Sequence, residues 1–353
     1  MRSVYVASTE GSGGKTTLSL GLCLALRQRG IDAGYFKPVG LLPQRTATQL
    51  VDEDATFVAG LLGLDDAPED ICPVVLDERA LHDVLTGSDV DAMARVEAAF
   101  RRVSEGKDMV VCEGLGEIWQ GRFLRTSGAD VVQQLDLKAL LVAKFAGARL
   151  LDDIAYVKDA LRARLLGVIF NMVPETRLAV VESEYKPYLY GQGIATYGVI
   201  LTDKRLLAVT VGEVAHALDG TYVCGEEYEH ALVENYMIGA MSPEHALRFF
   251  EKEDHKAVIV GGDRAELILA ALETATAVVV LTGDYVPSPA VLSRAEELGV
   301  PMISVAFDTV TAAEGVRRLY GRLRVNDPVK IDLVARIVAE RVDLTRLIND
   351  LAK

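Results

Sequence analysis

A glycine-rich segment near the start of the chain combines a lysine and hydroxyl groups in a spacing suited to binding phosphate. The segment comprises Thr9, Glu10, Gly11, Ser12, Gly13, Gly14, Lys15, Thr16 and Thr17. Glycines let backbone N–H groups turn inward around an anion, and the N-terminus of a following helix adds the positive end of its dipole. In this pattern the lysine reaches the β- and γ-phosphates and the first threonine binds Mg²⁺. We therefore predict that the segment binds a nucleotide, with Lys15 on the phosphates and Thr16 on the metal.

The elements on both sides of this segment fit that prediction. The apolar run from Ser3 to Ser8 predicts a buried strand, and the run that begins at Lys15 predicts a helix ending at Gly30. One position departs from the usual phosphate-binding loop, because Thr9 stands where that loop begins with glycine. The intact run from Gly14 to Thr17 outweighs this departure.

Charged residues also follow two later predicted strands. Residues 33–36 predict a strand followed by Lys37, and residues 108–112 predict one followed by Glu113. The carboxyl ends of parallel strands line the ligand crevice of an α/β sheet, so both side chains are candidates for the site. Lys37 can equally be a solvated lysine at a strand end. Glu113, followed by two glycines in the next three positions, suits a ligand of Mg²⁺ or water.

Acidic residues begin the next predicted helix, at 55–62. Asp52 and Asp54 can complement the dipole of this helix or supply a ligand for Mg²⁺. The sequence does not show which of the two roles applies, nor which of the two aspartates would be the metal ligand. Further strands are expected at 139–142, 166–170 and 194–200, with helices at 90–103 and 150–163. The fifth strand ends at Asn171.

Five of these pieces, in order, resemble dethiobiotin synthetase and the related N-terminal domain of long phosphate acetyltransferases. They read TEGSGGKTT, YFKPVG, DEDA, EGLG and NMVP, at residues 9–17, 35–40, 52–55, 113–116 and 171–174. The resemblance implies a P-loop fold, a parallel sheet flanked by helices, over residues 1–204. It also implies ATP and Mg²⁺ as cofactors. The metal would be held by Thr16, Asp54 and Glu113, with Lys15 and Lys37 as catalytic cations and Asn171 reading adenine.

The resemblance also carries departures and an expectation about assembly. The segment from Val39 to Pro43 is apolar, whereas the synthetase has a polar segment there for its diamino-acid substrate, so carboxylation of a biotin precursor is not expected. The synthetase completes its substrate site with a second subunit. We therefore expect a homodimer or higher homo-oligomer.

The remainder of the chain predicts a second, smaller α/β unit over residues 205–325. Strands at 256–260, 277–281 and 302–305 alternate with helices at 264–273, 289–298 and 310–320, and Thr210 with Glu213 forms a capping box. These segments resemble the DRTGG domain of long phosphate acetyltransferases and of regulatory proteins. Residues 326–353 predict helices that cover the second unit or pair with another subunit. No counterpart of the acetyltransferase catalytic domain is recognised, so acetyl transfer by this chain alone is not expected.

Composition narrows the classes of partner. Half of the 353 residues are hydrophobic and the formal net charge is −14, which argues against nucleic acid and against an anionic membrane surface. No apolar run approaches the ~18 residues that span a bilayer. The four cysteines show no metal-ligand spacing, and Cys23 and Cys112 are expected to be buried free thiols. A cytoplasmic location fits this pattern.

Three hypotheses for function follow. The first is an ATP-binding protein that hydrolyses MgATP slowly, or transfers its phosphoryl group to a small carboxylate or carbamate, with a DRTGG domain that senses an unidentified small molecule. The second is a non-catalytic nucleotide sensor that regulates acetyl-phosphate or acetyl-CoA metabolism. The third, a ligase of the cobyrinate diamide-synthase kind, is weakest because no glutaminase domain with a cysteine nucleophile is recognisable.

Overall fold

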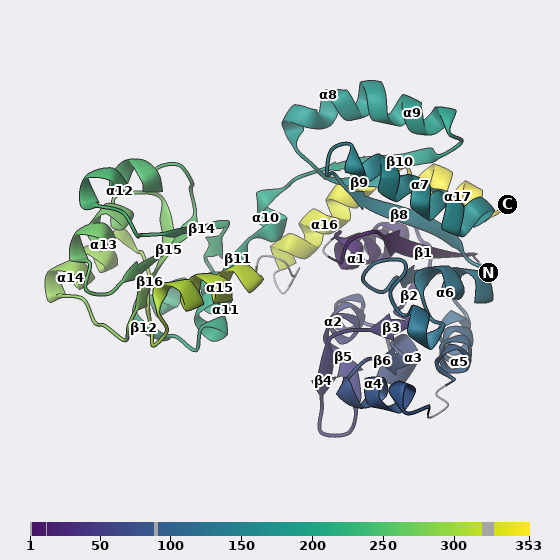
Figure 1. The fold of residues 1–353 in the computed structure, drawn as a ribbon, viewed down its shortest axis with the longest axis horizontal. Helices are drawn as coiled ribbons and strands as arrows, with labels where there is room; N and C mark the ends of the chain where they lie inside the picture. Colours follow the sequence, from purple (N-terminus) through teal and green to yellow (C-terminus); the bar gives the residue numbers. More distant parts are fainter. Residues whose placement is uncertain (1, 12, 88–90, 320–327) are drawn as a thin grey trace. The chain divides into compact units, whose positions relative to one another are not determined.

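The computed structural model describes residues 2–11, 13–87, 91–319 and 328–353 (Figure 1). Chain contacts divide the protein into two compact units. The first comprises Met1–Thr202 together with Asn326–Lys353, and the second comprises Asp203–Val325. The second unit is therefore an insertion into the first along the chain.

The first unit is built on a sheet of six parallel strands. Their spatial order is β10-β9-β8-β1-β7-β2. The strands are β1 (Arg2–Ser8), β2 (Ala33–Phe36), β7 (Met109–Glu113), β8 (Lys138–Lys144), β9 (Leu165–Val173) and β10 (Ala195–Leu201). Their apolar runs are buried on both faces, as parallel strands require, and all six were expected from the sequence.

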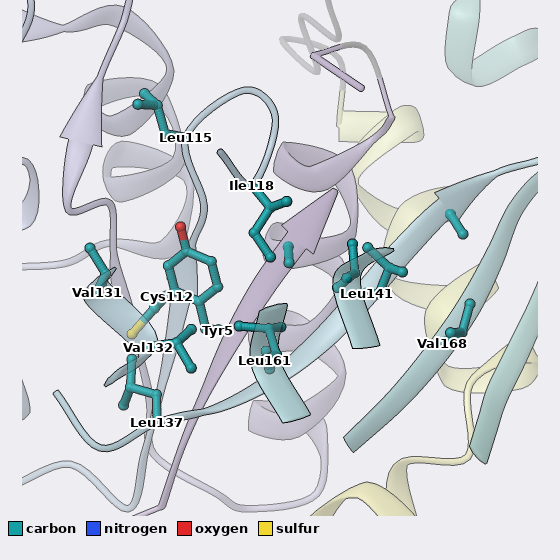
Figure 2. Packing of buried hydrophobic residues seen from close by; sticks show 14 of the residues in the cluster. Tyr5, Cys112, Leu115, Ile118, Val131, Val132, Leu137, Leu141, Leu161 and Val168 are labelled. Atoms are coloured by element: carbon teal, nitrogen blue, oxygen red, sulfur yellow. The ribbon is translucent and has the colours of Figure 1, made fainter. Parts of the chain in front are cut away.

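Helices cover both faces of this sheet. One face packs against α1 (Lys15–Gln28), α2 (Glu53–Leu62), α16 (Pro328–Arg341) and α17 (Leu344–Leu351). The other packs against α5 (Ala92–Ser104), α6 (Gly128–Gln134), α7 (Arg149–Leu161), α8 (Leu178–Val180) and α9 (Lys186–Gly191). Figure 2 shows part of the second interface, where Tyr5 of β1 and Leu141 of β8 join one cluster with Val132 of α6 and Leu161 of α7. The P-loop fold predicted from the sequence is confirmed.

A small lobe is inserted between β2 and β7. It contains β3 (Val39–Gly40), β4 (Pro43–Arg45), β5 (Leu50–Asp52), β6 (Val74–Val75), α3 (Pro68–Ile71) and α4 (Glu78–Leu85), besides the start of α2. Strand β3 pairs with β6 and β4 with β5. Two- and three-residue strands carry too little periodicity to be read from sequence, and none of these ribbons was expected.

The second unit is a three-layer α/β structure. Its sheet has the order β12-β17-β16-β15-β14. The strands are β12 (Thr221–Cys224), β14 (Asn235–Ile238), β15 (Lys256–Gly261), β16 (Thr276–Thr282) and β17 (Met302–Val305). Helices α12 (Pro243–Phe250), α13 (Ala265–Leu272) and α14 (Pro289–Leu298) pack on one face, and α11 (Val211–Ala217) and α15 (Thr309–Leu319) on the other. A short helix α10 (Lys204–Leu207) and a ribbon of β11 (Val209–Thr210) and β13 (Leu232–Val233) complete the unit.

A capping box and a mixed sheet characterise this unit. The capping box is confirmed, since the Thr210 side chain accepts from the N–H of Glu213 and the Glu213 carboxylate accepts from the N–H of Thr210. The sheet of this unit is mixed, because β12 runs antiparallel to β17 while its other strands pair in parallel. Strand β12 is half-buried at the sheet edge, so its sequence lacks the continuous apolar run of the central strands.

The C-terminal helices lie on the first unit, which corrects the expectation that they cover the second unit or another subunit. Val338 of α16 and Leu344 and Leu347 of α17 are buried in one cluster with α1. Gly21 of α1 lies so close to α16 that an added Cβ would be 2.5 Å from Val338 Cγ2. The two helices therefore pack at a distance that only glycine permits.

The cysteines are free thiols, with Cys23 and Cys112 buried as expected. Within the described ranges, no helix combines the length and apolar character that crossing a bilayer requires.

The close approach of α1 and α16 predicts opposite effects of one methyl group at two helical glycines. Gly21→Ala should lower the free energy of unfolding by ~1–3 kcal/mol, because the methyl group overpacks the contact with Val338. Gly60→Ala in α2, where an added Cβ meets nothing within 4 Å, should raise it by ~1 kcal/mol through helix propensity. Urea unfolding followed by fluorescence of Trp119, the single tryptophan and a residue of the first unit, measures both. Equal shifts for the two variants would contradict the close contact.

Candidate functional site

The side chains singled out in the sequence meet at the carboxyl edge of the six-stranded sheet. The glycine-rich segment joins the end of β1 to the start of α1. Lys37 follows β2, and Glu113 and Asn171 lie at or near the ends of β7 and β9. Because the strands are parallel, these positions share one edge, which is where ligands bind in open α/β sheets.

The glycine-rich loop is held by its own backbone. The carbonyl oxygen of Glu10 accepts from the Ser8 hydroxyl at 2.9 Å, from Lys15 Nζ at 3.1 Å and from the N–H of Gly13 at 3.3 Å. A Cβ at Gly13 would be 2.3 Å from Ser8 Oγ, so any larger residue there would displace the Ser8 hydroxyl from its bond to Glu10. Gly14 adopts φ of 88°, the left-handed region that glycine enters without strain.

Other loop residues are placed less directly. Thr9 is buried, Gly11 is exposed, and Thr16 and Thr17 are half-buried in the first turn of α1. Ser12, which we expected to contribute to the loop, lies outside the described residues. The loop and helix start therefore have the form that the sequence predicted from Gly13 to Thr17.

Lys15 is buried and bonded to the loop itself. Its side chain is nearly covered, at 5% exposure, and its Nζ donates to the carbonyl oxygens of Glu10 and Gly11. Burial lowers the pKa of Lys15 to about 8, and the nearby carboxylate of Glu113 opposes that shift. A bound anion would replace the loop carbonyls as its partner and raise the pKa of Lys15 back toward its ordinary value.

Glu113 lies at the centre of the site. Its Oε1 accepts from the Thr16 hydroxyl at 2.7 Å, and its Oε2 accepts from the Tyr35 hydroxyl at 2.8 Å. Burial raises the pKa of Glu113, while the ammonium group of Lys37, 3.7 Å from Oε1, acts in the opposite direction. The carboxylate is thus fixed in orientation beside the hydroxyl that was predicted to bind Mg²⁺.

Lys37 is surrounded by carboxylates. Its Nζ lies 2.8 Å from Asp52 Oδ1 and 3.3 Å from Asp54 Oδ2, in addition to the contact with Glu113. Burial alone would lower the pKa of Lys37, but the three carboxylates together raise it above its ordinary range. Lys37 is therefore a buried cation paired with carboxylates, and the alternative of a solvated lysine is wrong.

Asp52 and Asp54 have different surroundings. Asp52 is 1% exposed and also accepts from the N–H groups of Leu42 and Ala55, so it caps α2 and fixes the small lobe. Asp54 leaves a third of its side chain exposed beside Lys37. Asp52 is therefore saturated by protein donors, whereas an oxygen of Asp54 is accessible to a ligand.

Asn171 and Lys144 approach the loop from the neighbouring strands. The side-chain amide of Asn171 donates to the carbonyl oxygen of Gly13 at 2.9 Å. Lys144, which pairs with Asn171 in the β8–β9 register, has its Nζ 3.6 Å from a carboxylate oxygen of Glu10. Asn171 thus braces the loop in this structure, and its reading of adenine stays a prediction.

Sequence reasoning missed Tyr35 and Lys144. Tyr35 looked like one more apolar strand residue, because nothing in its neighbourhood reveals a buried hydroxyl partner. Lys144 could have been found, since it ends a parallel strand just as Lys37 follows one.

No group of three histidine, cysteine, aspartate or glutamate side chains arranged to hold a metal occurs among the residues that the structure describes. Magnesium in phosphate sites binds through one or two protein carboxylates, the phosphates and water, so it needs no such cage. Hydroxyl and carboxylate oxygens are the donors that Mg²⁺ prefers, and Thr16, Glu113 and Asp54 supply them.

The contrast between the two aspartates predicts different costs of removing each charge. Asp52→Asn should lower the free energy of unfolding by ~3 kcal/mol or more, because it breaks a buried ion pair and weakens a helix cap. Asp54→Asn, at a partly exposed pair, should change it by less than ~1 kcal/mol. Urea unfolding monitored at Trp119 separates the two; a tolerated Asp52→Asn would contradict the structural role.

The chain is similar to the phosphate acetyltransferase of Synechocystis sp., with 23% identity over 365 residues, covering 98% of this chain and 51% of the relative. It is also similar to the ATP-dependent dethiobiotin synthetase of Caldicellulosiruptor saccharolyticus, with 30% identity over 118 residues, 33% of this chain and 49% of that protein. The chain thus spans about half the length of the curated relatives it matches.

Among solved structures, the chain is similar to the septum site-determining protein of Pyrococcus horikoshii in complex with Mg-ADP. The identity is 18% and the TM-score 0.34, with coverage of 58% of this chain and 83% of the other.

Family models account for both units. The model of the DRTGG domain matches residues 213–319, inside the second unit. The model described as an AAA domain matches residues 2–206, more than half of the 353 residues. The resemblances read from the sequence are confirmed at this level. The chain belongs to the AAA domain family, with a P-loop nucleotide-binding first unit and a DRTGG domain as its second unit.

Proposed function

We propose that the nucleotide of the P-loop unit is ATP, bound with Mg²⁺, and that the site hydrolyses it slowly or transfers its phosphoryl group to a small carboxylate or carbamate. The observation that carries this proposal is the convergence of Lys15, Lys37, Thr16 and Glu113 at the carboxyl edge of one sheet. Two buried cations beside a hydroxyl–carboxylate pair are the groups that phosphoryl transfer requires, because catalysis there consists mainly of positioning and charge stabilisation.

Each side chain has a defined part in this proposal. Lys15 exchanges the loop carbonyls for phosphate oxygens, and the loop N–H groups surround the same anion. Lys37 is already fixed by Asp52, so its charge is in place before the phosphoryl group arrives and needs no reorganisation. Thr16, Glu113 and Asp54 would hold Mg²⁺, which neutralises developing phosphate charge.

The charges of the site support a metal. Around Lys15 and Lys37 lie the carboxyl groups of Asp52, Asp54 and Glu113, and burial favours the neutral form of Glu113. A divalent cation offsets the excess of carboxyl groups and favours ionisation of Glu113. Metal affinity should accordingly fall at acid pH as Glu113 takes up a proton.

A second candidate is a nucleotide sensor without turnover that regulates acetyl-phosphate or acetyl-CoA metabolism. It is favoured by the similarity of nearly the whole chain, both units together, to phosphate acetyltransferases. The two candidates share the nucleotide site and differ in whether phosphate is released.

MgATP at 100 times its Kd should stabilise the protein by ~2.7 kcal/mol, visible as a rise in the unfolding temperature. Lys15→Ala should abolish this rise while the variant without nucleotide stays folded, as checked by circular dichroism. GTP in place of ATP should give a smaller rise if Asn171 reads adenine. An undiminished rise in Lys15→Ala would remove the P-loop from the proposal.

Phosphate release then separates the two candidate functions. Release with MgATP alone, or on adding small carboxylic acids with bicarbonate, supports an enzyme. Binding without release by the wild type, under conditions where Lys15→Ala does not bind, supports the sensor. Lys37→Met should lose turnover while retaining part of the binding, since the Lys37 charge stabilises the transferring group. Its circular dichroism without nucleotide checks that the loss of the buried ion pairs has not unfolded the variant.

The next prediction is a pH dependence that follows from Lys15. Phosphate binding needs the charged ammonium group, and the pKa of Lys15 in the free protein is lowered to about 8. Affinity for ATP should therefore be about tenfold lower at pH 9 than at pH 7, with nearly one proton taken up on binding at pH 9. Calorimetry in buffers of different ionisation enthalpy measures both quantities.

The free energy of unfolding of the nucleotide-free protein should instead rise with pH, over a range that begins near the pKa of Lys15. Between about pH 8 and the ordinary lysine pKa, the unfolded chain binds more protons at Lys15 than the folded one, so this residue's contribution to stability rises with pH. An affinity independent of pH from 7 to 9 would show that Lys15 does not change its charge state on binding.

The last prediction concerns assembly. We propose that the chain forms at least a homodimer through the small lobe, where Leu41 is 41%, Leu81 46% and Leu85 76% exposed. Leu81 and Leu85 are one turn apart on α4, and contiguous exposed apolar surface often marks an interface. Light scattering should give a mass of at least twice 38.2 kDa. Leu85→Glu should lower that mass, and a wild-type mass near the monomer value would contradict the proposal.

A further inference from the structure

A carboxylate lies on the loop that is built to receive phosphate. Glu10 belongs to the glycine-rich segment, and its backbone carbonyl organises that segment by accepting from Ser8, Gly13 and Lys15. Its side chain keeps 30% of its surface exposed. A negative charge at this place repels a polyphosphate unless it is balanced.

The balancing charge comes from Lys144 at the end of β8. Its Nζ lies 3.6 Å from a carboxylate oxygen of Glu10, and 37% of its side chain is exposed. The strand fixes its place: Lys144 pairs with Asn171 in the register of β8 and β9, and the N–H of the next residue, Phe145, donates to the carbonyl oxygen of Asn171. The ends of β8 and β9 therefore hold the loop through the side-chain amide of Asn171 and the ion pair between Lys144 and Glu10.

We propose that Lys144 is a positioning residue that sets the affinity of the loop for polyphosphate by offsetting the charge of Glu10. The inference rests on the proposed nucleotide function of the first unit. Lys144 acts through the electrostatics of the loop and not by bonding the transferring phosphoryl group, a part that belongs to Lys15 and Lys37.

Charge balance of this kind has three measurable consequences. The effect of removing Lys144 grows with the number of phosphates, because the repulsion by an unpaired Glu10 scales with ligand charge. Salt weakens the effect, because both side chains are partly exposed. Removing the carboxylate has the opposite sign, so neutralising both partners restores the balance.

The experiment is a set of Kd measurements for AMP, ADP and ATP on the full chain in EDTA, without Mg²⁺, so that the charge of the ligand rises with each phosphate. Lys144→Met keeps the aliphatic stem and removes the charge, and should weaken ATP binding about threefold to tenfold, with a smaller loss for ADP and least for AMP. Glu10→Gln should tighten ATP binding, because it removes the negative charge and leaves Lys144 uncompensated. The double variant should return to within about twofold of the wild type.

Lys138→Met is the matched control. Lys138 is exposed at the opposite end of the same strand, about 20 Å away along β8 and beyond the screening length at physiological salt. The substitution changes the net charge equally and should leave all three Kd values unchanged. Unfolding temperatures of the four variants without nucleotide check that each is folded.

The outcomes distinguish this inference from the proposed function. A wild-type chain that binds neither MgATP nor any of the three metal-free nucleotides overturns the proposed function and the inference with it. A chain that binds MgATP but no metal-free nucleotide overturns the inference alone. A wild-type chain that binds ATP, with a double variant as weak as Lys144→Met, would mean that Lys144 contacts the nucleotide directly, and this overturns the inference alone. An equal loss for AMP and ATP, or an equal loss in Lys138→Met, overturns it as well.

Discussion

The buried ammonium group of Lys37 is the constraint on which the site and its supporting lobe both depend. A charge so deep is tolerated only with close partners, and here carboxylates from β5, α2 and β7 provide them. Asp52 serves twice, as the closest partner of Lys37 and as the cap of α2. One electrostatic requirement thus ties the inserted lobe to the central sheet and fixes a cation beside Glu113, the residue bonded to the first turn of α1.

From this cluster the rest of the site follows by contact. Glu113 links Lys37 to the first turn of α1 through Thr16 and is held on its other oxygen by Tyr35. The buried helix α1 in turn rests on α16, with Gly21 at the point of closest approach. The hydrogen bond at the N-terminal end of α1 and the apolar packing along its length therefore hold the same helix in place.

Sequence patterns predicted the long elements and the charged positions well, for physical reasons that differ by residue. Buried parallel strands have continuous apolar runs, and the carboxyl-edge rule brings Lys15, Lys37 and Glu113 together without any knowledge of distances. Partners that depend on tertiary packing were out of reach. The hydroxyl of Tyr35 finds Glu113 across neighbouring strands, and the difference between Asp52 and Asp54 arises from which backbone N–H groups lie nearby.

The position of the C-terminal helices also depends on tertiary packing and could not be predicted from sequence patterns. Their apolar faces were recognised, but an amphipathic pattern does not say which surface it covers. The sequence does contain one signal of this contact, Gly21 in the middle of α1. Glycine is costly inside a helix, and here its presence is explained by a neighbouring helix at close range. A glycine inside a strong helix pattern was therefore informative about a contact with a segment at the other end of the chain.

The insertion of the second unit has a consequence for how the protein is made. Arg29 and Thr345, which are hydrogen-bonded in the first unit, are 316 positions apart. During synthesis the DRTGG domain leaves the ribosome complete while the first unit still lacks α16 and α17, so the apolar side of α1 is uncovered for the time needed to translate the insertion. At ~5–20 residues per second this interval lasts several seconds or longer. A ribosome stalled within the second unit would therefore hold a chain whose first unit has an open hydrophobic face.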